Sequence, residues 1–278
     1  MRNKKLFLTK AALFLVLMFT LWSCEDTSEI KKHNWELTWQ DEFNDIPADK
    51  LPDATKWTYD LGAGGWGNAE WQSYTKSSQN VAIDLVDGVG CLKITARFDG
   101  TTYTSARIKT QGLFEHGYGR FEARIKLPYG PGMWPAFWLL GNNKETVVWP
   151  QCGEIDIMEY KGQEPNIVHG TIHGPVLYSG KAITQTYGLQ NARFDTDYHV
   201  FAVEWTEESI DFYVDETLYK RITRTEVESK KGEWVYDHPF FIILNLAVGG
   251  NFAGYPNEFT IFPQTMFVDY VRVYKVAI

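Results

Sequence analysis

Cysteine is scarce in this 278-residue chain, and basic residues are outnumbered by acidic ones. The three cysteines form no CxxC pair and no Cys/His cluster, which argues against a zinc site. Lys and Arg number 27 against 35 Asp and Glu, so no basic stripe suits a nucleic acid. Beyond residue 23 there is no repeat, no low-complexity tract and no helix-period pattern of ten residues. These absences favour a single all-β domain over two smaller ones.

The N-terminus reads as an export signal. The basic start MRNKK and the apolar run AALFLVLMFTL predict a signal peptide over residues 1–23. The run is too short to span a bilayer comfortably as a permanent helix. It ends in LWSC, which resembles the lipobox of bacterial lipoproteins, so we expect Cys24 to carry lipid. Residues 24–34 then form a polar tether, and residues 35–278 form the folded domain. An ordinary secretory signal cleaved nearby is the alternative.

Processing at this site makes the mature chain more acidic. Loss of Arg2, Lys4, Lys5 and Lys10 takes the net charge from -8 to -12. We expect an exported monomer in the cell envelope, held only by its N-terminal lipid, either at the outer membrane or displayed at the cell surface. The remaining cysteines, Cys91 and Cys152, lie in apolar strand-like runs, so buried free thiols are favoured over a disulfide.

Short runs of aromatic and β-branched residues, separated by Gly, Pro, Asn and Asp, predict many β-strands. In GRFEARIKL, apolar and charged residues alternate, as in a strand with one solvated face. FFIILNLAV is apolar apart from Asn245, as in a strand buried on both faces. The other clear runs are residues 91–98, 199–205, 209–215 and 267–274. Together they predict a two-sheet sandwich or jelly roll.

Tryptophans gather in two segments that look like loops. GAGGWGNAEWQSY holds Trp66 and Trp71, and GPGMWPAFWLL holds Trp134 and Trp138. An indole ring can stack on the apolar face of a sugar. Each one alone could equally fill the core, but four in two such segments indicate a carbohydrate groove.

Three acids occur within six positions of the segment GEIDIMEY. Glu154 and Asp156 share one face of a β-strand, whereas simple alternation sends Glu159 to the other face. A β-bulge at Ile157 or Met158 would return Glu159 to the face of the other two. Paired carboxylates about 5–5.5 Å apart are the equipment of a retaining glycosidase.

Three acids on one face cannot all ionise cheaply at neutral pH. One of them should keep its proton and so could serve as a general acid. The alternative is a solvent-facing acidic strand edge, which predicts interspersed lysines and no aromatic neighbours. The segment has aromatic neighbours on both sides, in WP before it and EY at its end, which argues against this alternative.

The segment EIDIME resembles the ExDxxE signature of glycoside hydrolase family 16, in the bulged form of its laminarinase-like members. Further segments resemble laminarinases in family order over roughly residues 35 to 275, among them LTWQDEFN, GGWGNAEWQ, YTSARIKT, WPQCGEIDIMEY, VHGTIHGP and LNLAVGGNFAG. The resemblance implies a concanavalin A-like β-jelly-roll with a concave substrate groove.

By position, the resemblance assigns Glu154 as nucleophile, Glu159 as acid/base and Asp156 as the acid that tunes their charge. It implies sugar binding by Trp134 and Trp138, and a contact from His173 to the sugar or the acid/base. The less specific matches are Asn68 and Arg107 as sugar-binding residues. His169 and Thr171 alternate with His173, and for His169 a structural role is equally open.

The resemblance implies no cofactor for catalysis. It implies a structural calcium ion held by the Asp269 side chain and backbone oxygens of Glu42 and Gly88, ligands of a type that suits calcium.

The expected activity is retaining endo-hydrolysis of β-1,3-glucan of the laminarin type or of mixed β-1,3-1,4-glucan. A non-catalytic surface glycan-binding lipoprotein is one alternative. A same-family agarase, carrageenase or porphyranase is another, although a sulfated substrate would favour basic groove residues. The fold alone does not fix the linkage.

Overall fold

The computed structural model describes residues 33–86 and 88–277, and Asn34–Ile278 form one compact unit. The predictions for the signal peptide, Cys24 and the tether up to residue 32 lie outside the described residues and stay predictions. No helix among the described residues is both long and apolar enough to cross a membrane.

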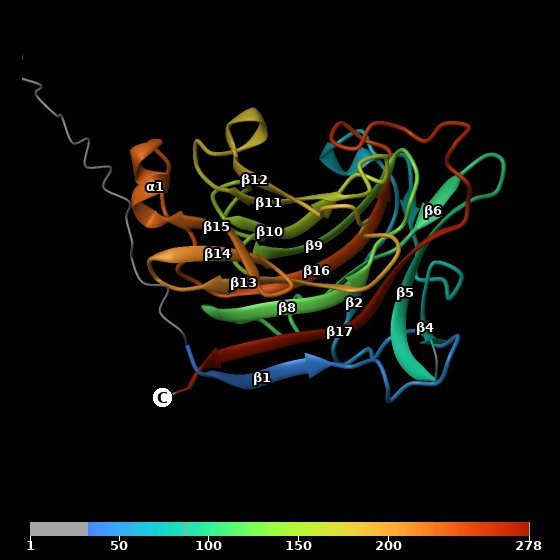
Figure 1. Cartoon of the computed structure of the whole chain (residues 1–278), viewed down its shortest axis with the longest axis horizontal. Coiled ribbons are helices and arrows are strands. Elements are labelled where there is room, and N and C mark those ends of the chain that lie inside the picture. Colours follow the sequence, from blue (N-terminus) through green and yellow to red (C-terminus); the bar gives the residue numbers. More distant parts are fainter. Residues whose placement is uncertain (1–32, 87, 278) are drawn as a thin grey trace, which may run out of the picture. The chain divides into compact units, whose positions relative to one another are not determined.

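The unit is all-β, as predicted, and its strands form two sheets that pack face to face (Figure 1). Within the described residues, one sheet has ten strands in the order β15-β14-β13-β8-β17-β5-β6-β3, with β1 beside β17 and β4 beside β5. Its strands are β1 (Trp35–Asp41), β3 (Ser73–Tyr74), β4 (Val81–Val86), β5 (Val89–Phe98), β6 (Tyr103–Ser105), β8 (Gly119–Lys126), β13 (His199–Trp205), β14 (Ser209–Val214), β15 (Thr217–Thr223) and β17 (Gln264–Val276).

The second sheet carries the candidate site and has seven strands in the order β12-β11-β10-β9-β16-β7-β2. Its strands are β2 (Thr58–Asp60), β7 (Arg107–Lys109), β9 (Met133–Gly141), β10 (Glu154–Tyr160), β11 (Ile167–His173), β12 (Ile183–Gly188) and β16 (Phe240–Val248). Three short helices complete the described elements: η1 (Gly65–Gly67), η2 (Ser179–Lys181) and α1 (Arg224–Ser229).

Residue patterns explain this layering. In β8 the apolar positions Phe121, Ala123 and Ile125 are buried between the sheets, while charged residues alternate with them. All nine residues of β16 are buried, because both faces of the strand are covered: Ile242 and Leu244 join the main core, and Phe241 and Ile243 pack in a separate cluster on the other face. The free thiols of Cys91 and Cys152 are both buried, which confirms that prediction.

Candidate active site

The predicted β-bulge is present in β10. Against β9, Asp156 pairs with Trp138 and Met158 pairs with Phe137, so Ile157 is the extra residue. Against β11, Asp156 pairs with Thr171 and Glu159 with His169. Gly170 alone therefore faces the two bulge residues. The extra residue restores the alternation, and all three acids open into one groove.

This groove has a volume of about 650 Å³ and lies over the seven-stranded sheet. Its walls combine aromatic rings with polar groups, as in sugar-binding sites. The predicted residues that line it are Trp66, Asn68, Arg107, Trp134, Trp138, Glu154, Asp156, Glu159, Thr171 and His173. One glycine shapes the wall: a Cβ on Gly250 would lie 3.0 Å from the Asn68 carbonyl oxygen and 3.1 Å from the Trp134 ring, and its φ is +116°.

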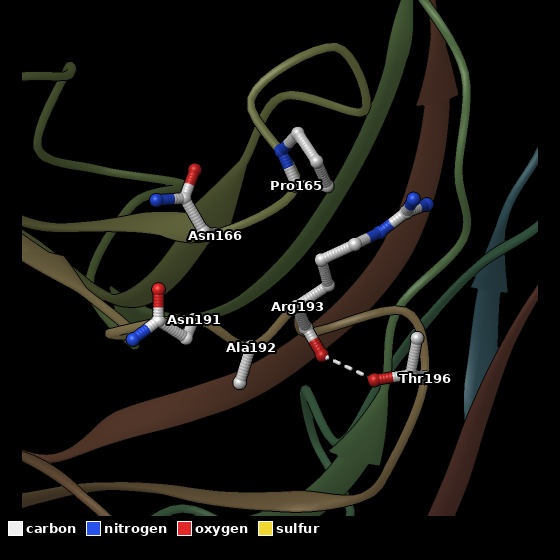
Figure 2. A pocket seen from close by; sticks show the side chains of 6 residues that line it. All are labelled: Pro165, Asn166, Asn191, Ala192, Arg193 and Thr196. Atoms are coloured by element: carbon white, nitrogen blue, oxygen red, sulfur yellow. Dashed lines mark hydrogen bonds between the residues drawn. The ribbon is translucent and has the colours of Figure 1, made fainter.

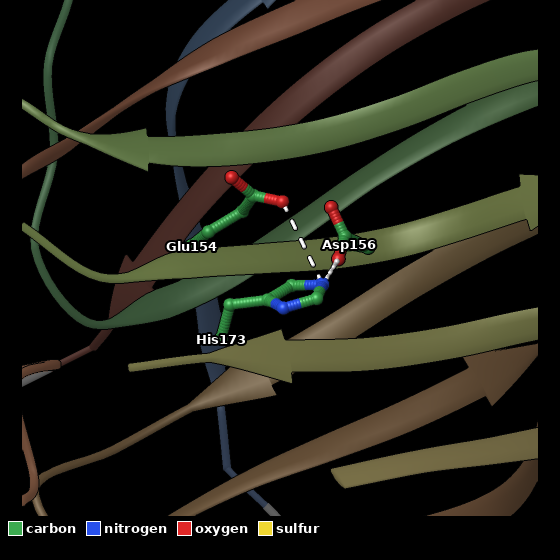
Figure 3. A group of neighbouring side chains, drawn as sticks. All are labelled: Glu154, Asp156 and His173. Carbon is green, nitrogen blue, oxygen red and sulfur yellow. Dashed lines mark ion pairs between the residues drawn. The ribbon is translucent and has the colours of Figure 1, made fainter. Parts of the chain in front are cut away.

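Glu154 lies among hydrogen-bond donors. Trp149 donates from Nε1 to Glu154 Oε2 over 2.9 Å. His173 Nε2 is 3.8 Å from Glu154 Oε1 and 3.2 Å from Asp156 Oδ2 (Figure 3). The predicted cleft histidine thus contacts the nucleophile candidate and the middle acid rather than Glu159, because it pairs with Glu154 across β10 and β11.

Glu159 has a more apolar environment. Its Oε1 accepts a hydrogen bond from Trp134 Nε1 over 3.1 Å. Phe252 packs 5.1 Å from the Trp134 ring, and the edge of His169 packs 5.1 Å from Phe252. His169 is buried and lies behind the groove wall, so its structural role is the one the contacts support.

Burial of the acids raises their pKa values. The pKa of Glu154 and that of Glu159 each rise to about 8, first because the groups are desolvated and next because Asp156 is nearby. Burial also raises the pKa of Asp156, to about 7. The trio therefore holds protons near neutral pH, as predicted.

The two glutamates differ in which form their neighbours favour. Trp149, His173 and Arg107 all favour the charged form of Glu154. Trp134 and His173 favour the charged form of Glu159, but two carboxyls, Asp156 and Glu154, oppose it, whereas Asp156 alone opposes it at Glu154. Both pKa values rise to about 8, and the charge of Glu154 raises the pKa of Glu159, so ionising Glu154 favours the protonated form of Glu159. The additional cationic neighbour makes Glu154 the one suited to nucleophilic attack, with Glu159 as the general acid.

A stack of polar and aromatic groups forms the groove floor beside Glu154. The Arg107 guanidinium lies 4.6 Å from the Trp138 ring centroid and 5.3 Å from that of Trp66. Arg107 is also paired with Asp60 over 2.9 Å. Trp138 Nε1 donates to Asn245 Oδ1 over 2.8 Å, which fixes the indole orientation.

The structure places Trp71 outside the groove lining, unlike the other three predicted tryptophans. Trp71 follows Glu70 in the segment just before β3, yet the two side chains have different surroundings. Glu70 faces the groove, while Trp71 stacks on Tyr255 with ring centroids 4.4 Å apart.

Sequence reasoning missed several lining residues, and four of them offer an aromatic ring or a polar group to the groove: Glu70, Trp149, Asn245 and Phe252. Each had a signal in the sequence. Asn245 is the lone polar residue of an apolar strand, and Trp149 begins the WP that precedes the acids. Glu70 and Phe252 lie in segments that already resembled laminarinases.

Two groups of residues bear on metal binding. Single donor atoms of Glu154, Asp156 and His173 all lie within 4.8 Å of one another, so this trio could hold a cation. Those atoms are the ones that the acid chemistry needs.

The calcium prediction concerns the other sheet. There Asp269 Oδ2 accepts a 2.7 Å hydrogen bond from Arg124 Nη1, and the Glu42 carboxylate pairs with Arg272. A guanidinium already neutralises the Asp269 carboxylate, so these contacts fit a calcium ligand poorly.

A second, shallow pocket lies between the β10–β11 and β12–β13 connections (Figure 2). It is lined by Pro165, Asn166, Asn191, Ala192, Arg193 and Thr196. Thr196 Oγ1 donates to the Arg193 carbonyl over 2.9 Å, and the Arg193 guanidinium pairs with Asp195. Its lining includes neither a carboxylate nor an aromatic ring, so it lacks the groups that the groove offers.

Comparisons with known proteins agree with this site. The family "Glycosyl hydrolases family 16" matches residues 66–269. The "Beta-glucanase" of Rhodothermus marinus is 42% identical over 288 residues, which cover 99% of this chain and 97% of that protein.

Two solved structures are similar over most of the chain. The catalytic domain of an endo-1,3-beta-glucanase (laminarinase) from Thermotoga petrophila RKU-1 has a TM-score of 0.82 at 44% identity, covering 89% of this chain and 100% of that one. The endo-beta-1,3-glucanase from Pyrococcus furiosus has a TM-score of 0.82 at 45% identity, covering 88% and 96%. This chain belongs to glycosyl hydrolase family 16.

Proposed function

We propose that the protein is a retaining endo-glycosidase that cleaves β-1,3-glucan of the laminarin type, and mixed β-1,3-1,4-glucan where the groove admits it. The observation that carries this proposal is the bulge at Ile157, which brings Glu154 and Glu159 into one groove, where burial raises the pKa of both.

Each carboxyl has a defined task in the proposed reaction. Glu154 attacks the anomeric carbon while Glu159 protonates the leaving glycosidic oxygen, so the C–O bond breaks and a glycosyl ester forms. Glu159, now ionised, takes a proton from a water molecule, whose oxygen attacks the same carbon. The ester bond breaks, Glu154 leaves as a carboxylate, and the sugar keeps its original configuration.

The groove walls suit a neutral sugar chain. Trp134, Trp138 and Trp66 offer rings to the apolar faces of sugars, and Asn68 and Asn245 offer amides to hydroxyls. The two basic lining residues each have a carboxylate partner: Arg107 pairs with Asp60 and Lys144 with Glu145. A sulfated galactan would need free cations, so neutral glucan is the better match.

The test measures reducing ends released from laminarin, lichenan, curdlan and agarose by the purified protein. We expect release from laminarin, with a fall of about 10³-fold or more in Glu154→Gln and Glu159→Gln, both of which should still bind glucan. A non-catalytic glycan-binding protein would release nothing in any form. Either variant keeping most of its rate would refute the assignment.

For the N-terminus, we propose lipidation at Cys24 and display in the cell envelope, supported by the LWSC segment. Fatty-acid labelling of the wild type but not of Cys24→Ser tests it. The structural calcium ion is a separate proposal that rests on the resemblance and not on the Asp269 contacts, and a thermal melt with and without EGTA tests it. A melting temperature unchanged by EGTA would refute it.

A further inference from the structure

An ordered stack of aromatic rings lies on the surface beside the groove. Tyr255 stacks on Trp71 with centroids 4.4 Å apart, and Trp71 packs against Tyr103 at 5.5 Å. Tyr103 in turn stacks on Phe98 at 4.4 Å, and Phe262 flanks it at 5.4 Å. The members come from four separate segments, so the stack is a product of the fold.

Much of this stack is exposed to solvent. Trp71 is 46% exposed, Tyr255 42% and Phe98 40%. An exposed patch of contiguous apolar side chains usually marks a surface that binds something. Two of the rings carry hydroxyl groups, which makes the surface amphipathic in the way a sugar chain is.

The stack is continuous with the catalytic groove. Trp71 N donates to the Val248 carbonyl over 2.8 Å, which fixes Trp71 at the end of β16. The next residue of the chain after β16 packs against the stack: a Cβ on Gly249 would lie 2.8 Å from Tyr255 and 3.5 Å from Trp71. Gly250 follows it, and a Cβ there would lie 3.0 Å from the Asn68 carbonyl oxygen and 3.1 Å from the Trp134 ring of the groove wall. Figure 1 shows the segment after β16 passing beside β6, where Tyr103 begins the strand.

We propose that the stack of Tyr255, Trp71, Tyr103 and Phe98 is a second glucan-binding surface, which holds the part of a long chain that extends beyond the groove. This inference rests on the proposed glucanase function. The stack is longer than one sugar ring and begins where the groove wall ends, so a polysaccharide reaches it while a short oligosaccharide fills only the groove. The surface therefore favours long chains over short ones.

The test compares Trp71→Ala, Tyr255→Ala and the double variant with the wild type on long laminarin and on a β-1,3-linked glucose tetramer. We expect KM for laminarin to rise by about three- to tenfold in the double variant, as for the loss of aromatic contacts. The ratio of kcat/KM on laminarin to that on the tetramer should fall by a similar factor. Leu85→Ala is the matched control, because Leu85 is 56% exposed on β4 and belongs to neither surface.

A binding measurement separates this role from catalysis. In a Glu154→Gln background, the double variant should migrate faster than its parent in a gel containing laminarin. An unchanged chain-length ratio together with unchanged migration would overturn the proposal while leaving the glucanase function intact. The proposal would also be overturned if the wild type dimerised in solution or bound lipid vesicles and the double variant did neither. If the wild type releases no reducing ends from any glucan, it is the proposed function that fails.

Discussion

Trp149 donates a hydrogen bond from its indole Nε1 to Oε2 of Glu154 over 2.9 Å. Trp134 does the same for Glu159, from Nε1 to Oε1 over 3.1 Å. Each of the two glutamates thus has its own indole donor. A donor of this kind stabilises the charged carboxylate and lowers its pKa, against the rise that burial causes.

Replacing each indole by phenylalanine removes the donor and keeps an aromatic ring. Trp149→Phe should raise the pKa of Glu154 and move the acidic limb of the kcat/KM profile up by about one pH unit. Trp134→Phe should raise the pKa of Glu159 and move the basic limb of the same profile to higher pH by a similar amount. The measurement is kcat/KM on laminarin from pH 4 to pH 10.

Because the three acids interact, each apparent pKa in the profile belongs to the three together and not to one residue. The difference between the two variants is therefore what separates the role of Glu154 from that of Glu159. Each variant serves as the control for the other, since both lose one indole from the same groove. If both substitutions shifted the same limb, the separate roles of Glu154 and Glu159 would be wrong.

The same burial predicts a cost in stability. The folded protein raises the pKa of Glu154 from 4.5 to about 8, so between these values it binds more protons than the unfolded chain. The free energy of unfolding should therefore decrease as pH rises from about 4.5 to about 8. Glu154→Gln removes this dependence, and we expect it to stabilise the fold by about 2 kcal/mol at pH 8 and by almost nothing at pH 4.

Urea unfolding at both pH values measures this difference. Glu145→Gln is a suitable control because Lys144 and Gln111 lower the pKa of Glu145, so its loss should remove stability above that pKa. A Glu154→Gln variant that is less stable than the wild type at pH 8 would show that burial of the charged Glu154 carboxylate does not destabilise the folded protein.

The sequence was enough to predict the bulge, because acid spacing carries the information. Side chains alternate along a strand with a period of two, so an interval of five between Glu154 and Glu159 requires one extra residue if both face the same sugar. The two-sheet sandwich could be predicted from strands such as β16, because a continuous apolar run is stable only where other parts of the protein bury both faces of the strand.

Contacts between distant segments could not be predicted in this way. Nothing in the local sequence indicates that Trp71 leaves the groove to stack on Tyr255, because the two residues meet only through the pairing of the 71–72 segment with the end of β16. The partners of His173 depend on the register between β10 and β11, which sets Glu154 opposite it.

Gly170 tests whether the bulge itself positions the acids. It faces Ile157 and Met158 across the strand pair, and a Cβ there would lie 2.3 Å from Tyr219 Oη and 2.6 Å from the Phe212 ring. Gly170→Ala must therefore push β11 away from the ten-stranded sheet, to which Phe212 and Tyr219 belong, and shift its pairing with the bulge. We expect a loss of about 1–3 kcal/mol in unfolding free energy, together with a lower kcat on laminarin.

A second substitution distinguishes displacement from general damage. The Tyr219 hydroxyl is buried and has no hydrogen-bond partner among the described residues, so Tyr219→Phe alone should cost little. Combined with Gly170→Ala it removes the nearest clashing atom, and the double variant should regain part of both the stability and the kcat. If the double variant regains stability but not kcat, the pairing of β10 with β11 does not position the acids. In that case the sheet has been restored without bringing Glu159 back into reach of the sugar that Glu154 attacks.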